Sequence, residues 1–401
     1  MRILFLSPYP PSLIRVRPFN WIKHLVARGH QITLLTLVGS AQETRDLQEV
    51  ARYCQRVESV PFPRWRPPLN LLLALPRFSL PLQAAFTHSP AMQRRIRQIL
   101  EQESFDVVHI EHLRGSTYAG AISGTPTVWD SVDCISLLFE RTLKSGPTLS
   151  SRLMARADLA RTRRYEGRQV GRHAATLVTS PEDRDTLENL VQHWGDPASG
   201  QIVVLPNGVD LAYFAPLELP RQPDRVIFSG KMSYHANVAA ALYLGQEIMP
   251  RVWRKRPDVR LQIVGKDPAP AVRALAADPR IMVTGYVPDM RPFLASAAVA
   301  AVPLRYAVGI QNKVLEAMAM GTPVVTTPQT RTALLAHEEE HFLIGKDSDD
   351  FARQVIRLLN DRELAVRIGQ AGRHYVEAHH DWHHLAAQLE QVYRRAAAMR
   401  D

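Results

Sequence analysis

Cysteine and long apolar runs are both scarce in this sequence. Its 401 residues include only two cysteines, Cys54 and Cys134, which exclude a disulfide scaffold or a cysteine metal cluster and fit a reducing cytoplasm. The longest apolar piece, NLLLALP at 70–76, is far shorter than the roughly 18 residues that cross a bilayer. The start, MRILFLSPYP, has a short apolar run that prolines follow at once, so it predicts a first strand and not a signal peptide.

Acidic residues are outnumbered by basic ones. The sequence has 39 Asp and Glu against 49 Lys and Arg, a net charge of +10 and a pI of about 9.8. Such a balance favours an anionic partner: nucleic acid, acidic lipid or a phosphorylated substrate. Zinc-finger, RRM-like and basic-zipper patterns are missing, so we expect no nucleic-acid partner.

Strand-like runs alternate with helical patterns along the whole chain, which favours α/β sheets and, at this length, two domains. A proline-rich stretch, FAPLELPRQPDR at 214–225, is interpreted as the interdomain linker. The final segment, 381–398, places Trp382, Leu385, Leu389 and Val392 on one helical stripe. The strands are expected at 2–6, 31–38, 57–62, 106–111, 126–130, 174–179, 202–205, 225–229, 260–264, 281–284, 298–302, 323–326 and 342–344.

The most informative stretch is VAAVPLRYAVGIQNKVLEAMAMGTPVVTT at 299–327. A buried strand, a short loop and a helix follow one another, and the N-terminus of such a helix attracts phosphate. Lys313 and Glu316 are three residues apart, so both project near one helix face. A cation for a diphosphate and a carboxylate for a ribose hydroxyl would suit a nucleotide. An ordinary βαβ unit with solvated polar residues is the alternative.

Several motifs in order carry a resemblance to a known family. They are VLPNGVDLAYF at 204–214, IFSGKM at 227–232, LQIVG at 261–265, VTGYVPDMRPFLASA at 283–297, GIQNKVLEAMAMGTPVV at 309–325, AGRHYV at 371–376 and the pair Asp381–Trp382. This order resembles the retaining nucleotide-sugar glycosyltransferases of the GT-B fold, in the glycogen-synthase-like and mannosyltransferase-like group. The pattern is also similar to sugar transferases of exopolysaccharide gene clusters. The resemblance covers nearly the whole second half and the first half only in outline.

The resemblance implies a fold and a reaction. The expected fold has an N-terminal Rossmann-like acceptor domain at 1–207, a C-terminal Rossmann-like donor domain at 208–376, and a final segment at 377–401 whose helix crosses back to the first domain. The two domains would face a central cleft. The enzyme would retain the anomeric configuration and need neither metal nor cofactor. Its donor would be a nucleotide diphosphate sugar, either a UDP-sugar or a GDP-sugar. A donor phosphate oxygen would take the proton of a sugar or lipid-linked acceptor.

The resemblance also implies roles for single residues. Glu316 stands where the family holds the donor ribose, and Lys313 stands near the phosphates. Gly230 and Lys231 match the Gly-Arg/Lys pair that follows the first strand of the second domain. The diphosphate loop would comprise Gly309, Ile310 and Gln311, and the nucleobase pocket Gly265, Tyr286 and Val287.

Three departures from the family pattern bear on the donor site. Val308 replaces the first glutamate of the motif, which touches the donor sugar, and Ala236, with His235 beside it, replaces a second basic residue. No glycine precedes Gly29, so the N-terminal glycine loop is missing. Arg15 and Arg17, in the loop after the first strand, could reach phosphate by their side chains, or they could be surface residues.

Polar residues follow two first-half strands. Glu111 and His112 bracket the position of a histidine that faces the donor sugar in relatives. Alternation along the strand places His109 and Glu111 on one face and His112 on the other, and a structural hydrogen-bond role is the alternative. Asp130 and Asp133 could bind acceptor hydroxyls or cap the next helix.

Two clusters of potential metal ligands, one of histidines and one of acidic residues, are not expected to hold metal. His379, His380, His383 and His384 lack the cysteines or ordered carboxylates of a structural zinc site. The run DSDD at 347–350 reads as an N-cap with an acidic first turn.

A basic helix at 150–172 carries arginines 156, 164, 168 and 172 in one stripe. Together with Arg64–Trp65–Arg66 and the leucines of 69–75, it could dock on an anionic membrane, on the inner face if the protein is cytoplasmic. A solvated helix face and a buried apolar loop are the alternative. Two other functions stay open: a GT-B epimerase or phosphorylase, and a non-catalytic nucleotide-sugar-binding subunit.

Overall fold

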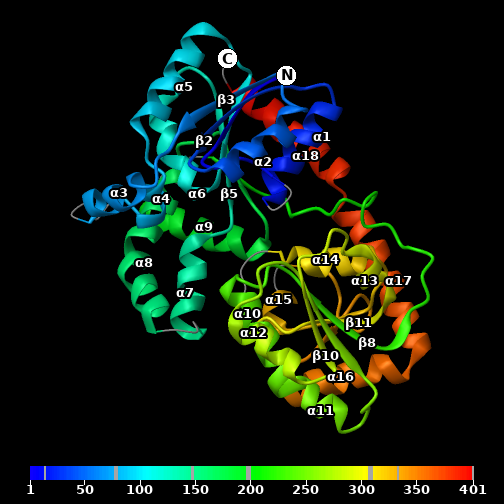
Figure 1. The fold of residues 1–401 in the computed structure, drawn as a ribbon. Helices are drawn as coiled ribbons and strands as arrows, with labels where there is room; N and C mark the ends of the chain where they lie inside the picture. The colour runs from blue at the N-terminus through cyan, green and yellow to red at the C-terminus, as the bar shows by residue number, and fades with distance from the viewer. Residues whose placement is uncertain are drawn as a thin grey trace. The chain divides into compact units, whose positions relative to one another are not determined.

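The structure is a computed structural model that describes residues 1–12, 15–75, 80–145, 149–195, 200–305, 310–331 and 334–399. The chain forms two compact units. Unit 1 contains Met1–Pro206 and Trp382–Asp401, and unit 2 contains Asn207–Asp381. Figure 1 shows the course of the chain through both units. Each unit is an α/β domain with its own sheet and core.

Unit 1 is built on a seven-stranded parallel sheet in the described residues, with strand order β3-β2-β1-β4-β5-β6-β7. The order reverses between β1 and β4, which is the Rossmann-like switch point where ligands bind at the carboxyl ends of strands. The strands are β1 (Arg2–Ser7), β2 (Gln31–Val38), β3 (Arg56–Pro61), β4 (Val107–Glu111), β5 (Thr127–Val132), β6 (Ala175–Val178) and β7 (Gln201–Val204).

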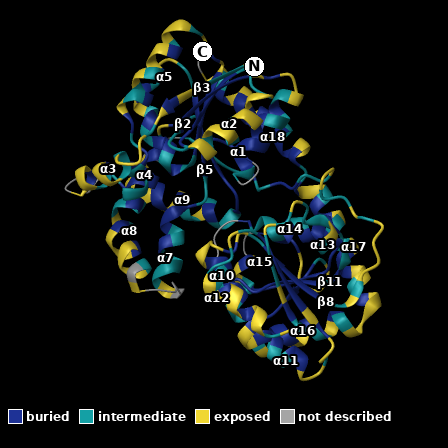
Figure 2. Ribbon diagram, in the orientation of Figure 1, coloured by how far each residue is buried: buried dark blue, intermediate teal, exposed yellow. Residues whose placement is uncertain are grey.

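Helices connect these strands, as parallel pairing requires. They are α1 (Val16–Ala27), α2 (Ala41–Ala51), α3 (Arg66–Ala74), α4 (Leu82–Phe86), α5 (Pro90–Gln102), α6 (His112–Gly115), the 3-10 turn η1 (Ser116–Ala121), α7 (Ile135–Ser145), α8 (Leu149–Val170), α9 (Pro181–Trp194) and α18 (Trp382–Ala398). The central strands are buried on both faces, as Figure 2 shows, so β1 and β4 read as near-continuous apolar runs.

Unit 2 carries a six-stranded parallel sheet in the described residues, with strand order β10-β9-β8-β11-β12-β13. Its switch point lies between β8 and β11. The strands are β8 (Gln222–Ser229), β9 (Arg260–Val264), β10 (Ile281–Gly285), β11 (Ala297–Val302), β12 (Val324–Thr326) and β13 (Leu343–Ile344).

The helices of unit 2 cover this sheet. They are α10 (His235–Tyr243), the π-helical turn η2 (Leu244–Ile248), α11 (Met249–Trp253), α12 (Pro270–Ala274), the 3-10 turn η3 (Leu275–Ala277), α13 (Arg291–Ser296), α14 (Asn312–Ala319), α15 (Pro328–Arg331), α16 (Ser348–Asn360) and α17 (Arg362–His379). The Asp347 side chain accepts a hydrogen bond from the Asp350 N–H at 2.8 Å, which confirms the predicted N-cap of α16.

Every predicted strand is present, with ends that shift by up to three residues. The interpretation of 214–225 as the interdomain linker is wrong. The chain passes from unit 1 to unit 2 between Pro206 and Asn207, Phe214 packs against the core of unit 2, and Gln222 already begins β8. A proline-rich composition indicated an irregular segment but not which core that segment packs against.

The last helix, α18, belongs to unit 1. Its predicted apolar stripe of Trp382, Leu385, Leu389 and Val392 is buried, and each such side chain contributes roughly 1.5–3 kcal/mol. Helix α18 packs beside α1, as Figure 1 shows, where the rings of Trp21 and Trp382 lie edge to face at 4.9 Å. The chain therefore begins and ends in the same unit.

No helix in the described residues combines the length and the apolar character needed to cross a membrane.

Candidate functional site

The switch point of unit 2 is shaped by two glycines that touch each other. Gly230 follows β8 and Gly265 follows β9. Both have a backbone φ of +145°, a conformation that residues other than glycine rarely adopt. A Cβ on Gly265 would lie 1.8 Å from the Gly230 carbonyl oxygen. Only glycine fits at this position, because any side chain would push the two strand ends apart. The predicted donor-site residues Gly230 and Gly265 thus lie together.

Asn237 holds the turn that follows β8. This residue is buried in α10, and its Nδ2 donates to the Lys231 carbonyl oxygen at 2.9 Å. A Cβ on Gly230 would lie 2.8 Å from Asn237 Nδ2 and 3.2 Å from Lys313 Cε. The Lys231 side chain is exposed. The Gly230–Lys231 turn is therefore in contact with the helix that carries Lys313.

Lys313 and Glu316 lie in the first turns of α14, which follows β11. Both side chains are half-buried. Burial lowers the pKa of Lys313 to about 8 and raises that of Glu316, while the opposite charge of each residue opposes the shift of the other. Within the described part of the chain, neither side chain takes part in a hydrogen bond or an ion pair. Two charged groups are thus held near a strand end and left for a ligand.

The remaining donor-site predictions are placed differently. Tyr286 is exposed at 73% and Val287 is half-buried against the core of unit 2, both after β10. Ile310 is buried, and Gln311 precedes the first residue of α14. Val308 and Gly309 lie outside the described residues. These positions stay predictions.

Ala236 is buried inside α10, so no basic side chain is supplied from that position. His235, the first residue of the helix, is exposed, and partial desolvation of its ring lowers its pKa. Lys231 and Lys313 are the predicted donor-site residues that can supply positive charge here.

In unit 1, Arg17 and Asp130 form a buried ion pair. Arg17 Nε and Nη2 donate to the two Asp130 carboxylate oxygens at 2.7 and 3.1 Å, and Trp21 Nε1 donates to Asp130 Oδ2 at 3.0 Å. Arg17 Nη1 also donates to the carbonyl oxygens of Leu205 and Pro206. The predictions that Arg17 binds donor phosphate and that Asp130 binds the acceptor do not fit this geometry, because each group is already engaged by the other.

A second buried network lies beside β4. His109 Nε2 is 3.4 Å from Glu111 Oε2, and His109 Nδ1 is 2.8 Å from the Tyr393 hydroxyl of α18. Strand alternation correctly placed His109 and Glu111 on one face. Burial lowers the pKa of His109 to about 4 and raises that of Glu111 well above its usual range. His109 therefore joins α18 to the sheet, and a role of Glu111 in contacting sugar stays a prediction.

The turn after β5 is held by buried carboxylates from other helices. Glu166 accepts from the N–H groups of Ile135 and Ser136 at 2.7 and 3.1 Å, and Asp183 accepts from the Cys134 N–H at 2.9 Å. The N-terminus of α7 is thus capped by Glu166, and the alternative that Asp130 or Asp133 caps it is wrong.

The Asp133 carboxyl at this turn has a single hydrogen-bond partner in the part of the chain that the structure describes. Thr179 Oγ1 donates to Asp133 Oδ1 at 3.1 Å. Burial and the nearby Asp183 raise the pKa of Asp133 to about 7. Val132, just before it, has φ +68°, which is strained for a β-branched residue. Strain beside a half-buried acid at a strand end is typical of a functional position, and acceptor binding by Asp133 stays a prediction.

His112 and Arg15 lie near Tyr9 at the switch point of unit 1. His112 has φ +64°, and its Nδ1 accepts from the Arg114 N–H at 3.2 Å. Burial lowers the pKa of His112 to about 3, so the imidazole is neutral and carries its proton on Nε2. Arg15 Nη2 donates to Glu43 Oε1 at 3.3 Å, and its guanidinium lies over the Tyr9 ring at 4.3 Å. Phosphate binding by Arg15 stays a prediction.

Among the described residues, one group of three side chains has the spacing of metal ligands. The side chains of His109, Glu111 and Asp130 place ligand atoms within 4.8 Å of one another. The negative charge of Asp130 is already neutralised by the Arg17 guanidinium, which takes the place that a metal ion would have beside this carboxylate. Of the four clustered histidines, His380 is buried, and its Nδ1 donates to the Asn207 carbonyl oxygen at 2.7 Å.

Three residues were missed by sequence reasoning: Asn237, Tyr393 and Arg114. Asn237 is a lone polar residue among the small apolar residues of α10, in the segment HANVAAAL, and that break in the apolar face was the available signal. Tyr393 directly follows Val392 of the predicted α18 stripe, and nothing in the sequence distinguished it from a core aromatic. Arg114 had no signal in the sequence, because its surroundings depend on α4.

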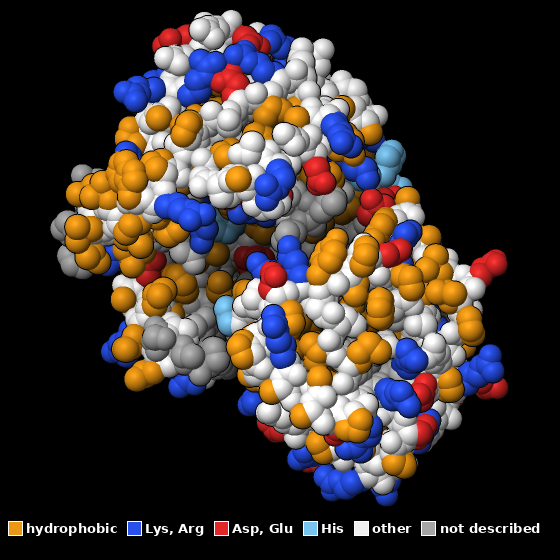
Figure 3. All heavy atoms as spheres, viewed as in Figure 1, with side chains coloured by type: hydrophobic (Ala, Val, Ile, Leu, Met, Phe, Trp, Pro, Cys, Tyr) orange, Lys and Arg blue, Asp and Glu red, His pale blue; other side chains and the backbone are white. Residues whose placement is uncertain are grey.

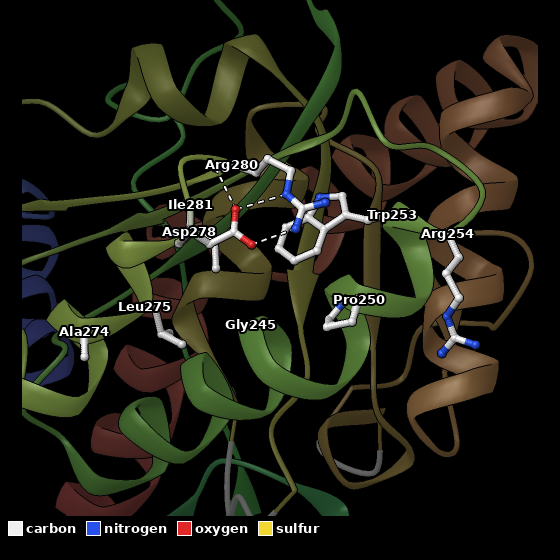
Figure 4. A pocket seen from close by; sticks show the side chains of 9 residues that line it. All are labelled: Gly245, Pro250, Trp253, Arg254, Ala274, Leu275, Asp278, Arg280 and Ile281. Carbon is white, nitrogen blue, oxygen red and sulfur yellow. Dashed lines mark hydrogen bonds and ion pairs between the residues drawn. The ribbon is translucent and has the colours of Figure 1, made fainter.

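A separate hollow of about 500 Å³ lies in unit 2 near the start of β10, whereas the two glycines follow the ends of β8 and β9. Figure 4 shows the Arg280 guanidinium over the Trp253 indole, at 3.8 Å, and beside Asp278. The Arg280 charge is thus already paired with Asp278 in the wall of the hollow.

Two family models match the chain. The model described as Glycosyltransferase Family 4 matches residues 16–213, and the model described as Glycosyl transferases group 1 matches residues 223–361. The two matches fall almost entirely on unit 1 and unit 2 respectively.

Curated relatives align along most of the chain. The phosphatidyl-myo-inositol mannosyltransferase of Mycobacterium tuberculosis strain H37Rv is 28% identical over 420 positions, with 99% of this chain and 97% of that protein covered. The protein of the same name from Mycolicibacterium smegmatis is 27% identical over 325 residues, with 77% of this chain and 76% of that protein covered.

Solved structures share the fold. Sucrose-phosphate synthase from Thermosynechococcus elongatus superposes with a TM-score of 0.70 at 18% identity, over 100% of both chains. Anabaena HepE in complex with UDP and glucose superposes with a TM-score of 0.64 at 14% identity, over 98% of both chains. At these identities the likeness shows the two-domain Rossmann-like fold alone.

Proposed function

We propose a reaction for this chain, which belongs to the nucleotide-sugar glycosyltransferases of GT-B type. It transfers a hexose from a UDP- or GDP-sugar to an acceptor hydroxyl with retention of configuration. Unit 2 binds the donor and unit 1 binds the acceptor. The acceptor is a sugar or a lipid-linked sugar, in glycolipid or exopolysaccharide synthesis on the cytoplasmic side of a membrane. Relatives named as mannosyltransferases support a hexosyl donor.

One observation carries the donor proposal: Lys313 and Glu316 are half-buried, oppositely charged and without a partner in the described residues, in the helix that follows β11 at the switch point. A partly desolvated charge costs free energy unless an opposite charge or hydrogen bonds compensate it. A diphosphate would compensate Lys313, and ribose hydroxyls would donate to the Glu316 carboxylate. Gly230 lets Lys313 approach the strand end, since its missing Cβ leaves room for Lys313 Cε.

The reaction needs charge stabilisation on the leaving diphosphate. The bond between the anomeric carbon and the diphosphate oxygen breaks, and a bond to the acceptor oxygen forms on the same face. The acceptor proton passes to the departing phosphate oxygen. Lys313 and Lys231 would neutralise the developing charge, the type of preorganised electrostatics that usually contributes most to catalysis. With two lysines in this role, we expect activity in the presence of EDTA.

Calorimetric titration with GDP, UDP and ADP tests the donor site. We expect one nucleotide to bind wild type selectively and to bind Glu316→Ala at least tenfold more weakly, since a hydrogen bond to a charged group is worth about 1.5–3 kcal/mol. Glu363→Ala is the matched control, because Glu363 is an exposed glutamate in α17 of the same unit. Equal affinity of wild type and Glu316→Ala would refute the ribose assignment.

Asp133 is the proposed acceptor contact in unit 1. Its carboxyl is oriented by Thr179 and has a pKa of about 7, so near neutral pH it can accept a hydrogen bond from an acceptor hydroxyl. Asp133→Asn should raise the acceptor KM and leave nucleotide binding unchanged. A normal acceptor KM in this variant would remove Asp133 from the site.

Unit 1 also presents a surface suited to an anionic membrane. Trp65, Leu69, Leu72 and Leu73, which lie at the start of α3 and along it, are 40–63% exposed and share one helix face. In α8, Leu149, Leu153 and Met154 are exposed beside Arg152 and Arg156. Hydrophobic side chains gather in this part of unit 1 in Figure 3. Apolar side chains flanked by arginines match the headgroup region of an anionic bilayer.

Vesicle sedimentation tests this surface. Wild type should bind vesicles of phosphatidylcholine with phosphatidylglycerol more strongly than vesicles of phosphatidylcholine alone. The variant Leu72→Asp/Leu73→Asp should bind less to the anionic vesicles, whereas Leu335→Asp, at an exposed leucine of unit 2, should bind normally. Equal binding by all three proteins would place the membrane contact elsewhere or nowhere.

A second candidate function follows from Val308. A valine at the position of the family's sugar-contacting glutamate fits a subunit that binds a nucleotide sugar without turning it over. A wild type that binds nucleotide but is inert with every acceptor, and that gains nothing from Val308→Glu, would support this function.

A further inference from the structure

Arg114 is a half-buried arginine just after β4, at the switch point of unit 1. It lies in α6, and its guanidinium lies over the Phe86 ring at 5.2 Å. The Arg114 Nε is buried, and no hydrogen-bond partner for it is present among the described residues. The backbone N–H of Arg114 donates a hydrogen bond to His112 Nδ1. The backbone of Arg114 is therefore held in place, whereas its guanidinium has no hydrogen bond among the described residues.

No carboxylate of the described residues pairs with Arg114. After burial, the Tyr9 hydroxyl has the largest influence on the pKa of Arg114 and raises it, and the neighbouring cation Arg15 lowers it. Tyr9 does not supply a full negative charge, because burial raises its own pKa. Burial lowers the pKa of Arg114 itself. By contrast, Arg17 in the same unit is buried against Asp130. An uncompensated, partly buried guanidinium is costly and is best explained by an anion that binds there.

Arg114 is also connected to the exposed apolar helix α3. Helix α4 contacts both α3 and α6. Asn70 of α3 donates from Nδ2 to the carbonyl oxygens of Phe86 and His88, at 3.2 and 2.8 Å, and Thr87 Oγ1 donates to the Arg114 carbonyl oxygen at 2.9 Å. The unpaired cation and the exposed leucines are therefore held by one continuous set of contacts.

We propose that Arg114 binds the phosphate group of an amphiphilic phosphate ester that serves as acceptor, with the apolar chain of that ester on α3. The inference rests on the proposed function and narrows its acceptor to an anionic one. A guanidinium makes bidentate, charge-assisted hydrogen bonds to phosphate oxygens. The Nε2–H of His112, whose Nδ1 is fixed by the Arg114 N–H, adds a donor beside it.

The test uses octyl phosphate, inorganic phosphate and octyl glucoside as probes in calorimetric titrations of the full-length protein. Octyl phosphate should bind wild type and bind Arg114→Gln at least tenfold more weakly, the loss expected for a charge-assisted contact. Arg114→Lys should retain part of the affinity. Arg94→Gln, at an exposed arginine of α5 in the same unit, is the matched control and should bind as wild type does.

Other probes separate the phosphate from the chain. Inorganic phosphate should bind more weakly than octyl phosphate, and Leu72→Asp should weaken octyl phosphate alone. Octyl glucoside, which has no phosphate, should bind wild type and Arg114→Gln with equal affinity. Equal affinity of octyl phosphate for wild type and Arg114→Gln would overturn the proposal, and inorganic phosphate binding as tightly as octyl phosphate would overturn its apolar part.

Nucleotide titration of the same proteins keeps this inference distinct from the proposed function. Arg114→Gln should bind GDP or UDP as wild type does. Normal nucleotide binding with unchanged octyl phosphate binding refutes only the role of Arg114. Failure of every protein to bind nucleotide refutes the donor site, and the octyl phosphate titration still decides whether Arg114 is an anion site.

Discussion

The switch points of the two units differ in whether their charged side chains are paired. In unit 1, Arg17 is paired with Asp130, and His109 bridges Glu111 and Tyr393. In unit 2, Lys313 and Glu316 have no partner in the described residues. The same strand-end geometry therefore carries an internally compensated network in one unit and uncompensated charges in the other.

The difference separates structural charges from ligand-binding ones. A buried pair that satisfies itself holds helices on a sheet and has no reason to bind an ion. Charges that are desolvated and unpaired gain most when a ligand arrives. By this criterion Arg114 groups with the charges of unit 2, although it lies in unit 1.

The largest expected effect comes from breaking the compensated network. Asp130→Ala removes the carboxylate that neutralises the buried Arg17 guanidinium, so we expect a loss of about 3–5 kcal/mol in the free energy of unfolding. Urea denaturation measures it. The double variant Arg17→Met/Asp130→Leu should recover much of this loss, because an apolar pair needs no compensation. A loss below about 1 kcal/mol in Asp130→Ala would mean that the pair is not structural.

Removing an uncompensated charge should affect activity instead. We expect Lys313→Ala to lower kcat/KM for sugar transfer by on the order of 10²–10³, as for loss of one group that stabilises transition-state charge. The unfolding free energy should change little, since no hydrogen bond or ion pair of the described residues is lost with the Lys313 side chain. Lys255→Ala, at an exposed lysine of unit 2, is the control. A marked loss of stability without a loss of kcat/KM would give Lys313 a structural role.

The pKa of Lys313 sharpens the comparison through pH. With a pKa of about 8, Lys313 is protonated below that pH and loses its charge above it. Nucleotide diphosphate affinity should therefore be level below about pH 8 and fall by up to about tenfold per pH unit above it. Lys313→Arg, which stays charged, should show a flat profile, and a matching fall in that variant would assign the titration to another group.

The smallest effect is expected at Tyr393. Tyr393→Phe removes the hydrogen bond to His109 Nδ1, at 2.8 Å, and keeps the packing of α18. We expect a loss of about 1 kcal/mol in the free energy of unfolding, measured by urea denaturation. Tyr286→Phe alters an exposed ring and should change nothing. Equal stability of Tyr393→Phe and wild type would show that the network is dispensable.

Short-range pattern predicted the elements well. Strand positions followed from apolar runs, and the buried face of α18 followed from the spacing of Trp382 and Leu389. Position after a strand also pointed to Lys313 and Glu316. These features depend on neighbours within a few residues, so the linear order of side chains contains them.

Pairing between distant residues was not predictable. Arg17 and Asp130 are 113 positions apart, and Tyr393 and His109 are 284 apart. Both Arg17 and Asp130 were interpreted as ligand-binding residues, because the sequence shows a charge but not what compensates it.

The sequence by itself determined the two-sheet α/β architecture and the chemical groups at each strand end, because hydrophobic period and residue type act locally. The tertiary structure alone decided which of those groups are already satisfied. Compensation of a buried charge requires an ion pair or hydrogen bonds within a few ångströms. The sheet order of each unit brings Asp130 to Arg17 and leaves the side chains of Arg114, Lys313 and Glu316 without an ion pair or hydrogen bond in the described residues.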